Sequence, residues 1–426
     1  MVDTLGGPNV NFDGITSFSL ARNEKSYNGR WIEPDGAAGI AYMLYGAYHM
    51  TKDDPDPELR ALSEPFLTRA MWCVNYLDSR EDSPLYEVLA FLVIPVAARM
   101  NAENGTHYDI TKMIKFTLQG HSSVRNGWGM ITENWGDKYT CGLMGSITDN
   151  GGYAFSMNTF DAAWGYLPVV KYDTRYAYDI GQWMLAASNS ARLFYPESHS
   201  FTGSVSTDTV NGIDYYHWDG DFQSGNWIPD ATDPRASFIP YEGLRANKKG
   251  LNYVPGRDGV VKRNTNDTSK APYASGDAFT YDWGGLTDYG LYGASHVGMF
   301  GATIKKTNVD RILQIDLNAA DFFKASNSYP TYLYFNPHHS TQTVDYTKET
   351  ADNRLYNAVT KEFIPAGGAN TNVTIDIPAD DVVIVVELPA TGAVTLSGGS
   401  YLCNDIFVTS VVSIRSGKEQ EYVLRN

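Results

Sequence analysis

Three carboxylates stand among apolar or aromatic residues, where a carboxyl group can donate or accept a proton. Glu87 is the only charge in SPLYEVLAFLVIP, Asp149 precedes two glycines in DNGGYAFSMNTF, and Glu242 lies in FIPYEGL. Apolar surroundings raise the pKa of a carboxyl group and keep it protonated closer to neutral pH. Hydrolysis of a glycosidic bond needs two carboxyl groups, one of them protonated. These three residues are therefore the candidate catalytic groups.

Each candidate also has a structural interpretation, and the sequence leaves both open. Glu87 could pair with Arg99 inside the fold, because a buried unpaired glutamate is rare. Asp149 could close a glycine turn through its side chain. Glu242 could stabilise the first turn of a helix through the helix dipole.

The stretch from Trp218 to Tyr292 contains tryptophans and carboxylates interspersed with glycines. Flat aromatic side chains stack on the C–H faces of sugar rings, and carboxylates accept hydrogen bonds from hydroxyl groups. The alternative is a turn-rich region whose aromatics fill a core. The candidate substrate-binding residues of this stretch are Trp218, Asp221, Trp227, Tyr241, Asp277 and Asp288.

Two earlier segments carry residues of the same types. WIEPDG precedes a helical pattern, so its acids could also be first-turn carboxylates. NWG and DNGGYAFSMN place aromatic and amide side chains next to glycines, which let backbone approach a ligand closely. The candidate substrate-binding residues of these segments are Trp31, Glu33, Asp35, Trp135, Tyr153 and Asn158.

Two other classes of function fit the same residues. A polysaccharide lyase removes the proton next to a uronate carboxylate with a Tyr or His base, while Asn, Arg or His neutralises the acid. The residues of those types are Tyr153, Asn158, Tyr241, His217 and His296. A non-catalytic glycan-binding protein would use the aromatics without a pair of carboxylates within about 5–10 Å of each other.

Composition and motifs exclude several classes. A formal net charge of -16 disfavours a nucleic-acid partner, because phosphates repel an anionic protein. The 3 cysteines are far apart, and HExxH, a phosphate-binding loop and GxSxG are missing, so no metal or cofactor is expected. No apolar run of about 18 residues occurs, which predicts a soluble chain with no membrane partner. With 29 Tyr and 9 Trp, the composition suits a carbohydrate substrate.

Apolar residues at three- and four-residue spacing predict a helical region over residues 31–328, after an N-terminal arm over 1–30. The first two helices have a short polar link and should form an antiparallel hairpin. Capping boxes are expected at Thr106 and at Thr307, each with Asp three residues on. The helices are predicted at 36–49, 57–79, 83–100, 110–118, 173–194 and 308–323.

From Tyr329 the period changes to alternation, in short segments rich in Val, Ile, Thr and Tyr. This pattern predicts an antiparallel β-sandwich over residues 329–426. The chain is thus expected to be mainly α and then all-β.

Helical hairpins with long aromatic loops, followed by phrases such as YPTYLYFNP, resemble the (α/α) toroid carbohydrate-active enzymes, the six-hairpin glycosidases and related lyases. The resemblance implies a helical-hairpin toroid, possibly incomplete since fewer helices are expected than six hairpins need. It implies a glycoside hydrolase acting on an oligo- or polysaccharide, and a secreted or periplasmic location is favoured. Toroids gather loops at one end, so residues 120–158, 195–238 and 277–292 should meet in one cleft, with Trp31 and Glu33 at its rim.

Overall fold

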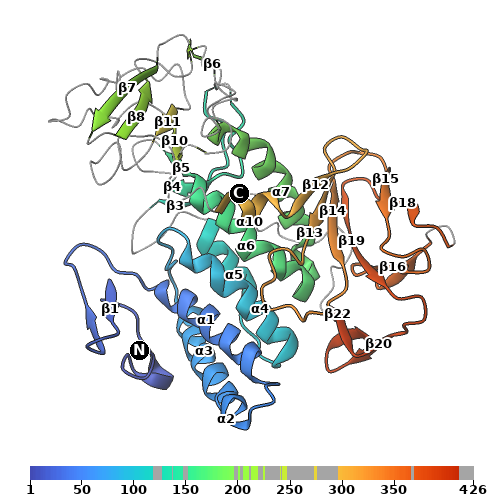
Figure 1. Cartoon of the computed structure of the whole chain (residues 1–426), viewed down its shortest axis with the longest axis horizontal. Coiled ribbons are helices and arrows are strands. Elements are labelled where there is room, and N and C mark those ends of the chain that lie inside the picture. The colour runs from blue at the N-terminus through green and yellow to red at the C-terminus, as the bar shows by residue number, and fades with distance from the viewer. Residues whose placement is uncertain are drawn as a thin grey trace.

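The molecule has a helical part followed by a part built of antiparallel sheets, as the sequence predicts (Figure 1). The computed structural model describes residues 1–118, 127–136, 138–146, 152–195, 240, 242–246, 296–365 and 369–411, with the backbone of short strands between residues 200 and 275. None of the helices in these ranges is long and apolar enough to cross a bilayer.

The first two long helices form the predicted antiparallel hairpin. Helix α1 spans Gly36–Thr51 and α3 spans Ser63–Asp78, with the single turn α2, Pro57–Arg60, in the link. The side chain of Asp56 caps α2 by accepting a hydrogen bond from the backbone of Glu58. The buried stripe of α3 consists of Leu67, Ala70, Cys73, Val74 and Leu77.

The predicted helix at 83–100 begins later than expected. A 3-10 turn, η2, covers Leu89–Leu92, and α4 covers Val93–Glu103. Residues 83–88 form an extended segment followed by a turn, because their polar groups are hydrogen-bonded to other segments of the chain. The Ser83 hydroxyl donates to the carbonyl of Phe116, and the backbone N–H of Tyr86 donates to Asp35.

Helix α5, Ile110–Leu118, is present, but the predicted capping box at its start is wrong. The Asp109 carboxylate accepts a hydrogen bond from the backbone of Lys112 and caps the helix alone. The Thr106 hydroxyl instead donates to the side chain of Asn101.

Helix α6, Ser156–Tyr172, runs through the middle of the helical part and is buried on nearly all sides. Its Gly165 lies against η2, where a Cβ atom would come within 2.7 Å of the Cβ of Phe91. The predicted helix at 173–194 follows as the turn η4, Thr174–Tyr176, the helix α7, Ala177–Ser190, and the turn η5, Ala191–Phe194. Figure 1 shows α6 between α4 on one side and α7 on the other.

A five-stranded antiparallel sheet covers the N-terminal end of α6. Its strands are ordered β11-β10-β5-β4-β3 and span Tyr273–Ser275, Gly243–Arg245, Tyr153–Phe155, Met144–Ser146 and Trp128–Met130. Strand β5 continues directly into α6. The sheet therefore joins the aromatic segment around residues 128–155 to residues 243–245 of the later stretch.

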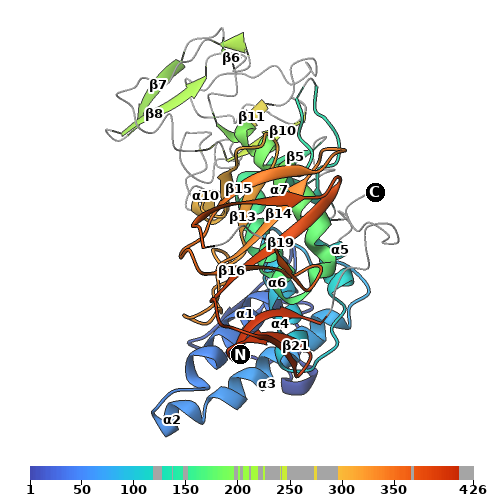
Figure 2. The ribbon, with the colours of Figure 1, turned by 90° about the vertical axis from the view of Figure 1, so that its right-hand side faces the viewer.

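The C-terminal part is built around a six-stranded antiparallel sheet of order β12-β13-β14-β19-β16-β17, with the β15–β18 pair packed on it (Figure 2). Alternate residues of β18 are buried, as one buried face requires. A smaller sheet, β20-β21-β22, follows. The strands are Ile304–Lys306, Leu313–Asp316, Thr331–Asn336, Gln342–Thr347, Arg354–Asn357, Glu362–Ile364, Asn372–Ile377, Asp381–Leu388, Val394–Ser397, Ser400–Cys403 and Ile406–Ser410, for β12 to β22.

The helix predicted at 308–323 is wrong. Its centre is strand β13, which pairs with β12 and β14, so that the sheet begins at residue 304. Arg311 has a left-handed backbone with φ 63°, which interrupts any helix there. The expected cap, Thr307, donates its hydroxyl to the carbonyls of Val309 and Ile312 within a turn. Sheet pairing therefore overrides the helical spacing of the apolar residues.

The N-terminal segment packs onto the helical core. It contains the turn η1, Gly7–Asn9, and the hairpin of β1, Ser17–Ser19, with β2, Glu24–Ser26. Its apolar side chains Val2, Leu5, Val10, Phe12 and Ile15 are buried in the same core as α1 and α3.

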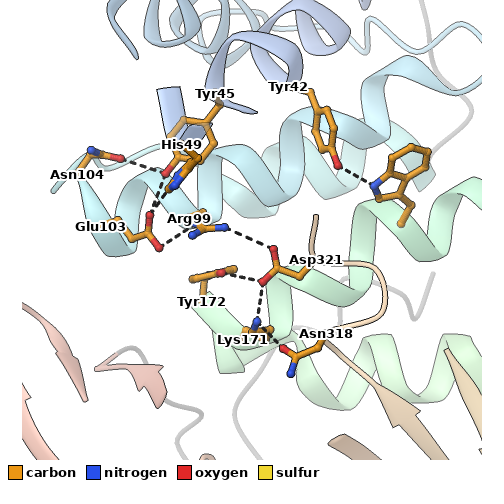
Figure 3. A network of polar contacts seen from close by, with 11 residues as sticks. Tyr42, Tyr45, His49, Arg99, Glu103, Asn104, Lys171, Tyr172, Asn318 and Asp321 are labelled. Carbon is orange, nitrogen blue, oxygen red and sulfur yellow. Dashed lines mark hydrogen bonds and ion pairs between the residues drawn. The ribbon is translucent and has the colours of Figure 1, made fainter. Parts of the chain in front are cut away.

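A buried group of charges joins the helical part to the sheets (Figure 3). Asp321 accepts hydrogen bonds from Lys171 Nζ at 2.6 Å and from Tyr172 Oη at 2.9 Å, and Arg99 lies 3.5 Å away. Glu103 balances the charge of Arg99 at 2.8 Å. These contacts hold the turn after β13 against α4 and α6.

We predict that Asp321→Asn lowers the free energy of unfolding by about 3–5 kcal/mol, because two buried cations lose their shared counter-charge. Denaturant unfolding at neutral pH measures the change. The surface pair of Arg22 and Glu24 provides the control, and Glu24→Gln should cost less than about 1 kcal/mol. Equal effects of the two substitutions would show that the buried group does not hold the two parts together.

Candidate functional site

Three carboxylates come together where α1 begins and where the chain approaches η2. Asp35 occupies the N-cap position of α1, Glu33 lies two residues before it, and the charge of Glu87 from the second segment acts on it. Asp35 is fully buried, and the other two are partly buried. Two sequence-predicted binding residues and one predicted catalytic residue thus meet in one cluster.

The Asp35 carboxyl group does not cap its own helix. Its Oδ2 accepts a hydrogen bond from the backbone of Tyr86 at 3.2 Å, and its Oδ1 is buried with no hydrogen-bond partner among the described residues. Burial raises the pKa of Asp35 well above its ordinary value of 3.8, and the negative charges of Glu33 and Glu87 raise it further. Burial and the two neighbouring carboxylates therefore both favour the protonated form of Asp35.

Glu87 has a left-handed backbone, with φ 59°, which costs a residue with a side chain roughly 1–2 kcal/mol. Two contacts on either side maintain this conformation. The Asn158 side-chain amide donates to the Glu87 carbonyl at 2.7 Å, and Asp35 holds the N–H of Tyr86. Asn158 comes from the first turn of α6 and is buried, so its position is fixed by the core. Strain that is maintained by buried polar groups is typical of functional sites.

A row of aromatic rings runs beside the carboxylates from α1 to the five-stranded sheet. Trp31 stacks on Tyr86 at 6.2 Å between ring centres, and Tyr86 meets Trp128 edge to face, also at 6.2 Å. Trp128 contacts Phe155, and Phe155 contacts Tyr153. Trp31 and Tyr86 are partly exposed, whereas the sheet residues are buried. The accessible end of the row is therefore the end nearest to Glu33 and Glu87.

The N-terminal segment fixes Trp31 and Glu33. The indole N–H of Trp31 donates to the Glu33 carboxylate at 2.8 Å. The Thr16 hydroxyl donates to the Trp31 carbonyl, and the backbone of Glu33 donates to the carbonyl of Ile15. The segment predicted as an arm is thus part of the support of the site.

The remaining described candidates lie in the interior. Glu242 is 1% exposed, and its backbone carbonyl accepts hydrogen bonds from Ser156 at the start of α6. Tyr153 and Trp135 are 3% and 4% exposed. The Trp135 ring covers Gly152, where a Cβ atom would come within 2.8 Å of it. These three side chains are therefore not accessible to a ligand in this structure.

Several sequence-predicted site residues lie outside the described residues, and their side chains are not discussed further. For Trp218 only the backbone is described, as the last residue of β8, Ile213–Trp218. The others are Asp149, Asp221, Trp227, Tyr241, Asp277 and Asp288. The predicted meeting of residues 195–238 and 277–292 with the site falls on the same ranges.

Two contacts of the site were not foreseen. Tyr86 precedes Glu87 in the sequence, and its position between Trp31 and Trp128 depends on the three-dimensional fold. His296, the residue before helix α10, Val297–Gly301, bonds through Nδ1 to the buried carboxylate of Asp161 on α6. This hydrogen bond raises the pKa of His296, because Asp161 stabilises the protonated ring.

Within the described residues, no group of three or more His, Cys, Asp or Glu is placed to hold a metal ion. No protein-family model and no curated protein sequence matches this chain. The arrangement of the site residues is therefore the basis for inferring what this protein does.

We predict that Glu87→Gly unfolds with a free energy about 1 kcal/mol higher than that of Glu87→Ala, because only glycine adopts a left-handed backbone without strain. Denaturant unfolding compares the two variants. Glu64, exposed in the first turn of α3, is the matched control. There the free energy of unfolding of Glu64→Ala should exceed that of Glu64→Gly by about the same amount. The same order at both positions would contradict the strain at residue 87.

We predict that Asp35→Asn changes the pH dependence of stability. The folded wild type keeps a proton on Asp35 that the unfolded chain releases above the ordinary pKa of 3.8, so its stability falls as pH rises from there. Asparagine does not ionise, so above about pH 4 the variant should gain stability relative to the wild type by up to about 1.4 kcal/mol per pH unit, until the pH reaches the raised pKa of Asp35 in the folded protein. Unfolding curves across this range measure the slope. The exposed Asp53→Asn should retain the wild-type slope, and a wild-type slope in Asp35→Asn would mean that Asp35 is charged.

Proposed function

We propose that this protein is a glycoside hydrolase that cleaves an oligo- or polysaccharide at the cluster of Glu33, Asp35 and Glu87. The observation that carries the proposal is the grouping of the fully buried Asp35 carboxyl group with the two partly accessible carboxylates of Glu33 and Glu87. Hydrolysis of a glycosidic bond needs one carboxyl group as acid and a second as base or nucleophile. The cluster offers both groups from two rigidly held segments.

The contacts of the two accessible carboxylates suggest separate roles. Glu33 accepts a hydrogen bond from the Trp31 indole, which fixes the direction of its carboxylate. Glu33 then attacks the anomeric carbon or takes a proton from the attacking water. Glu87 donates its proton to the leaving oxygen, and the strained backbone fixes the direction of its side chain. Asp35 acts on both through its buried position beside them.

The aromatic pair of Trp31 and Tyr86 supports a sugar ring as the substrate. The two rings are stacked, partly exposed and next to the acids. Stacking of an aromatic ring contributes on the order of 1 kcal/mol beyond its buried area. A sugar ring lying on Trp31 brings its glycosidic oxygen close to Glu33 and Glu87.

Elimination by a lyase receives less support from the same residues. Tyr153 is buried, and Asn158 is buried with its amide bonded to the Glu87 carbonyl. His296 is engaged by Asp161. A glycan-binding role without catalysis would leave the carboxylate cluster, with its strained Glu87, unexplained.

The helical part supports a toroid-like arrangement as a further element of this proposal. The pairs α1 with α3, α4 with α5, and α6 with α7 are successive helices packed against each other. Three such pairs correspond to half of a six-hairpin toroid. The carboxylate cluster lies at the end where α1 and α6 begin.

We predict that Glu33→Gln and Glu87→Gln each lower hydrolysis by at least about a hundredfold, because each removes one proton-transfer group. A panel of polysaccharides is screened for released reducing ends, with absorbance near 235 nm recorded to detect the unsaturated product of a lyase. Melting temperatures should remain close to that of the wild type.

Glu64→Gln, a surface change on α3, is the control and should keep full activity. Full activity of both site variants would refute the assigned roles. A rise in absorbance without hydrolysis would replace the hydrolase by a lyase.

A further inference from the structure

An apolar cavity of about 360 Å³ lies between the N-terminal segment and α1, and among the described residues Glu33 is the only acid that lines it. Phe12, Ile15 and Phe18 form one wall. Gly36 and Gly39 of α1, with the η2 residue Leu89 and its neighbours, form the other. The cavity therefore meets the carboxylate cluster at Glu33 and extends from there along α1.

Two glycines on α1 keep this space open. A Cβ atom at Gly36 would lie 3.7 Å from Phe12, and one at Gly39 would lie 3.4 Å from Leu89, which are ordinary contact distances. By contrast, Gly165 on α6 has no room for a Cβ atom, which would lie 2.7 Å from Phe91. Glycine in a helix costs about 1 kcal/mol relative to alanine. Close packing explains Gly165 but does not explain Gly36 and Gly39.

We propose that this cavity is a binding site for the apolar aglycone of an oligosaccharide glycoside, an alkyl or aryl group attached to the terminal sugar at the bond that is cleaved. An empty cavity of about 150 Å³ with apolar walls binds benzene, so the larger space here fits a group of roughly eight to ten carbons or two rings. The inference rests on the proposed function, because Glu33 places the polar end of such a ligand at the carboxylate cluster.

The low polarity of the cavity walls favours an alkyl or aryl group over a sugar ring. The walls offer few polar atoms, so a sugar ring would lose its hydrogen bonds to water inside the cavity. An alkyl or aryl group gains about 25 cal/mol for each Å² of apolar surface removed from water. The partly exposed pair of Trp31 and Tyr86 is next to Glu33 but is not among the lining residues of the cavity, and the sugar itself can stack on it.

The test fills the cavity with leucine side chains at both glycines. Fluorescence of the apolar probe N-phenylnaphthylamine is titrated with the wild type, with Gly36→Leu/Gly39→Leu and with Gly298→Leu. The last is a control on α10, where a Cβ atom meets no neighbour within 4 Å. We expect saturable binding to the wild type and the control, and affinity at least about tenfold lower in the filled variant. Each single variant serves if the double variant does not fold.

A second measurement separates this inference from the proposed function. Octyl and methyl glycosides of the same sugar are compared by kcat/KM, and the preference for the octyl compound should disappear in the filled variant alone. Glu33→Gln should lose hydrolysis and still bind the probe. Probe binding without hydrolysis of any glycoside would refute the hydrolase and the aglycone role but leave an apolar binding site. Equal probe binding by wild type and filled variant would overturn the site itself.

Discussion

The arrangement of the molecule depends on the neutralisation of charge around Asp321. Lys171, Arg99 and Asp321 are all nearly inaccessible to water, and the Asp321 carboxylate offsets the buried charge of Lys171 and, together with Glu103, that of Arg99. The aromatic side chains next to Asp321 continue the contact, since Phe322 meets Trp164 and Phe323 meets Tyr42. One turn of chain thereby fixes α1, α4 and α6 relative to each other and to the sheet.

That joint also determines the geometry of the site, although it lies at the far end of α6. The helix carries Lys171 and Tyr172 in its last turn and Asn158 in its first. Asn158 can hold the Glu87 carbonyl only if α6 is fixed along its axis and about it. The close contact of Gly165 with Phe91, halfway along, has the same effect. The position of the carboxylate cluster thus depends on contacts made by residues that are not part of the proposed site.

Local sequence patterns were sufficient where a single period decides the structure. The hairpin of α1 and α3 follows from apolar residues at three- and four-residue spacing, and the alternating strands after residue 329 follow in the same way. The pattern around residues 308–323 misled, because Ile312 and Ile315 have helical spacing but lie in sheet contacts with distant strands. The spacing of apolar residues cannot reveal a partner strand. It also cannot reveal the left-handed backbone of Arg311, which interrupts a helix at this position.

The site could be predicted by residue type but not by grouping. Acids, amides and indoles beside apolar residues suit sugar chemistry, and the candidates that the sequence offers on this ground include Glu33, Asp35, Glu87, Asn158 and Trp31. Their meeting depends on contacts such as Asp35 with Tyr86 and Asn158 with Glu87, which join segments far apart in the chain. The sequence does not point to Tyr86, because its place in the site depends on its contacts with Trp31 and Trp128, which only the fold brings next to it.

The distance in sequence between Lys171 and Asp321 has a consequence for how the chain is made. The two residues are 150 positions apart, so during synthesis the buried lysine waits for its counter-charge. At about 5–20 residues per second, that delay is roughly 10–30 s. Throughout this time the nascent helical part has an unpaired cation and exposed apolar surface, as species prone to aggregation do. Efficient production in a cell should therefore depend on chaperones that protect the N-terminal half until the turn at residue 321 leaves the ribosome.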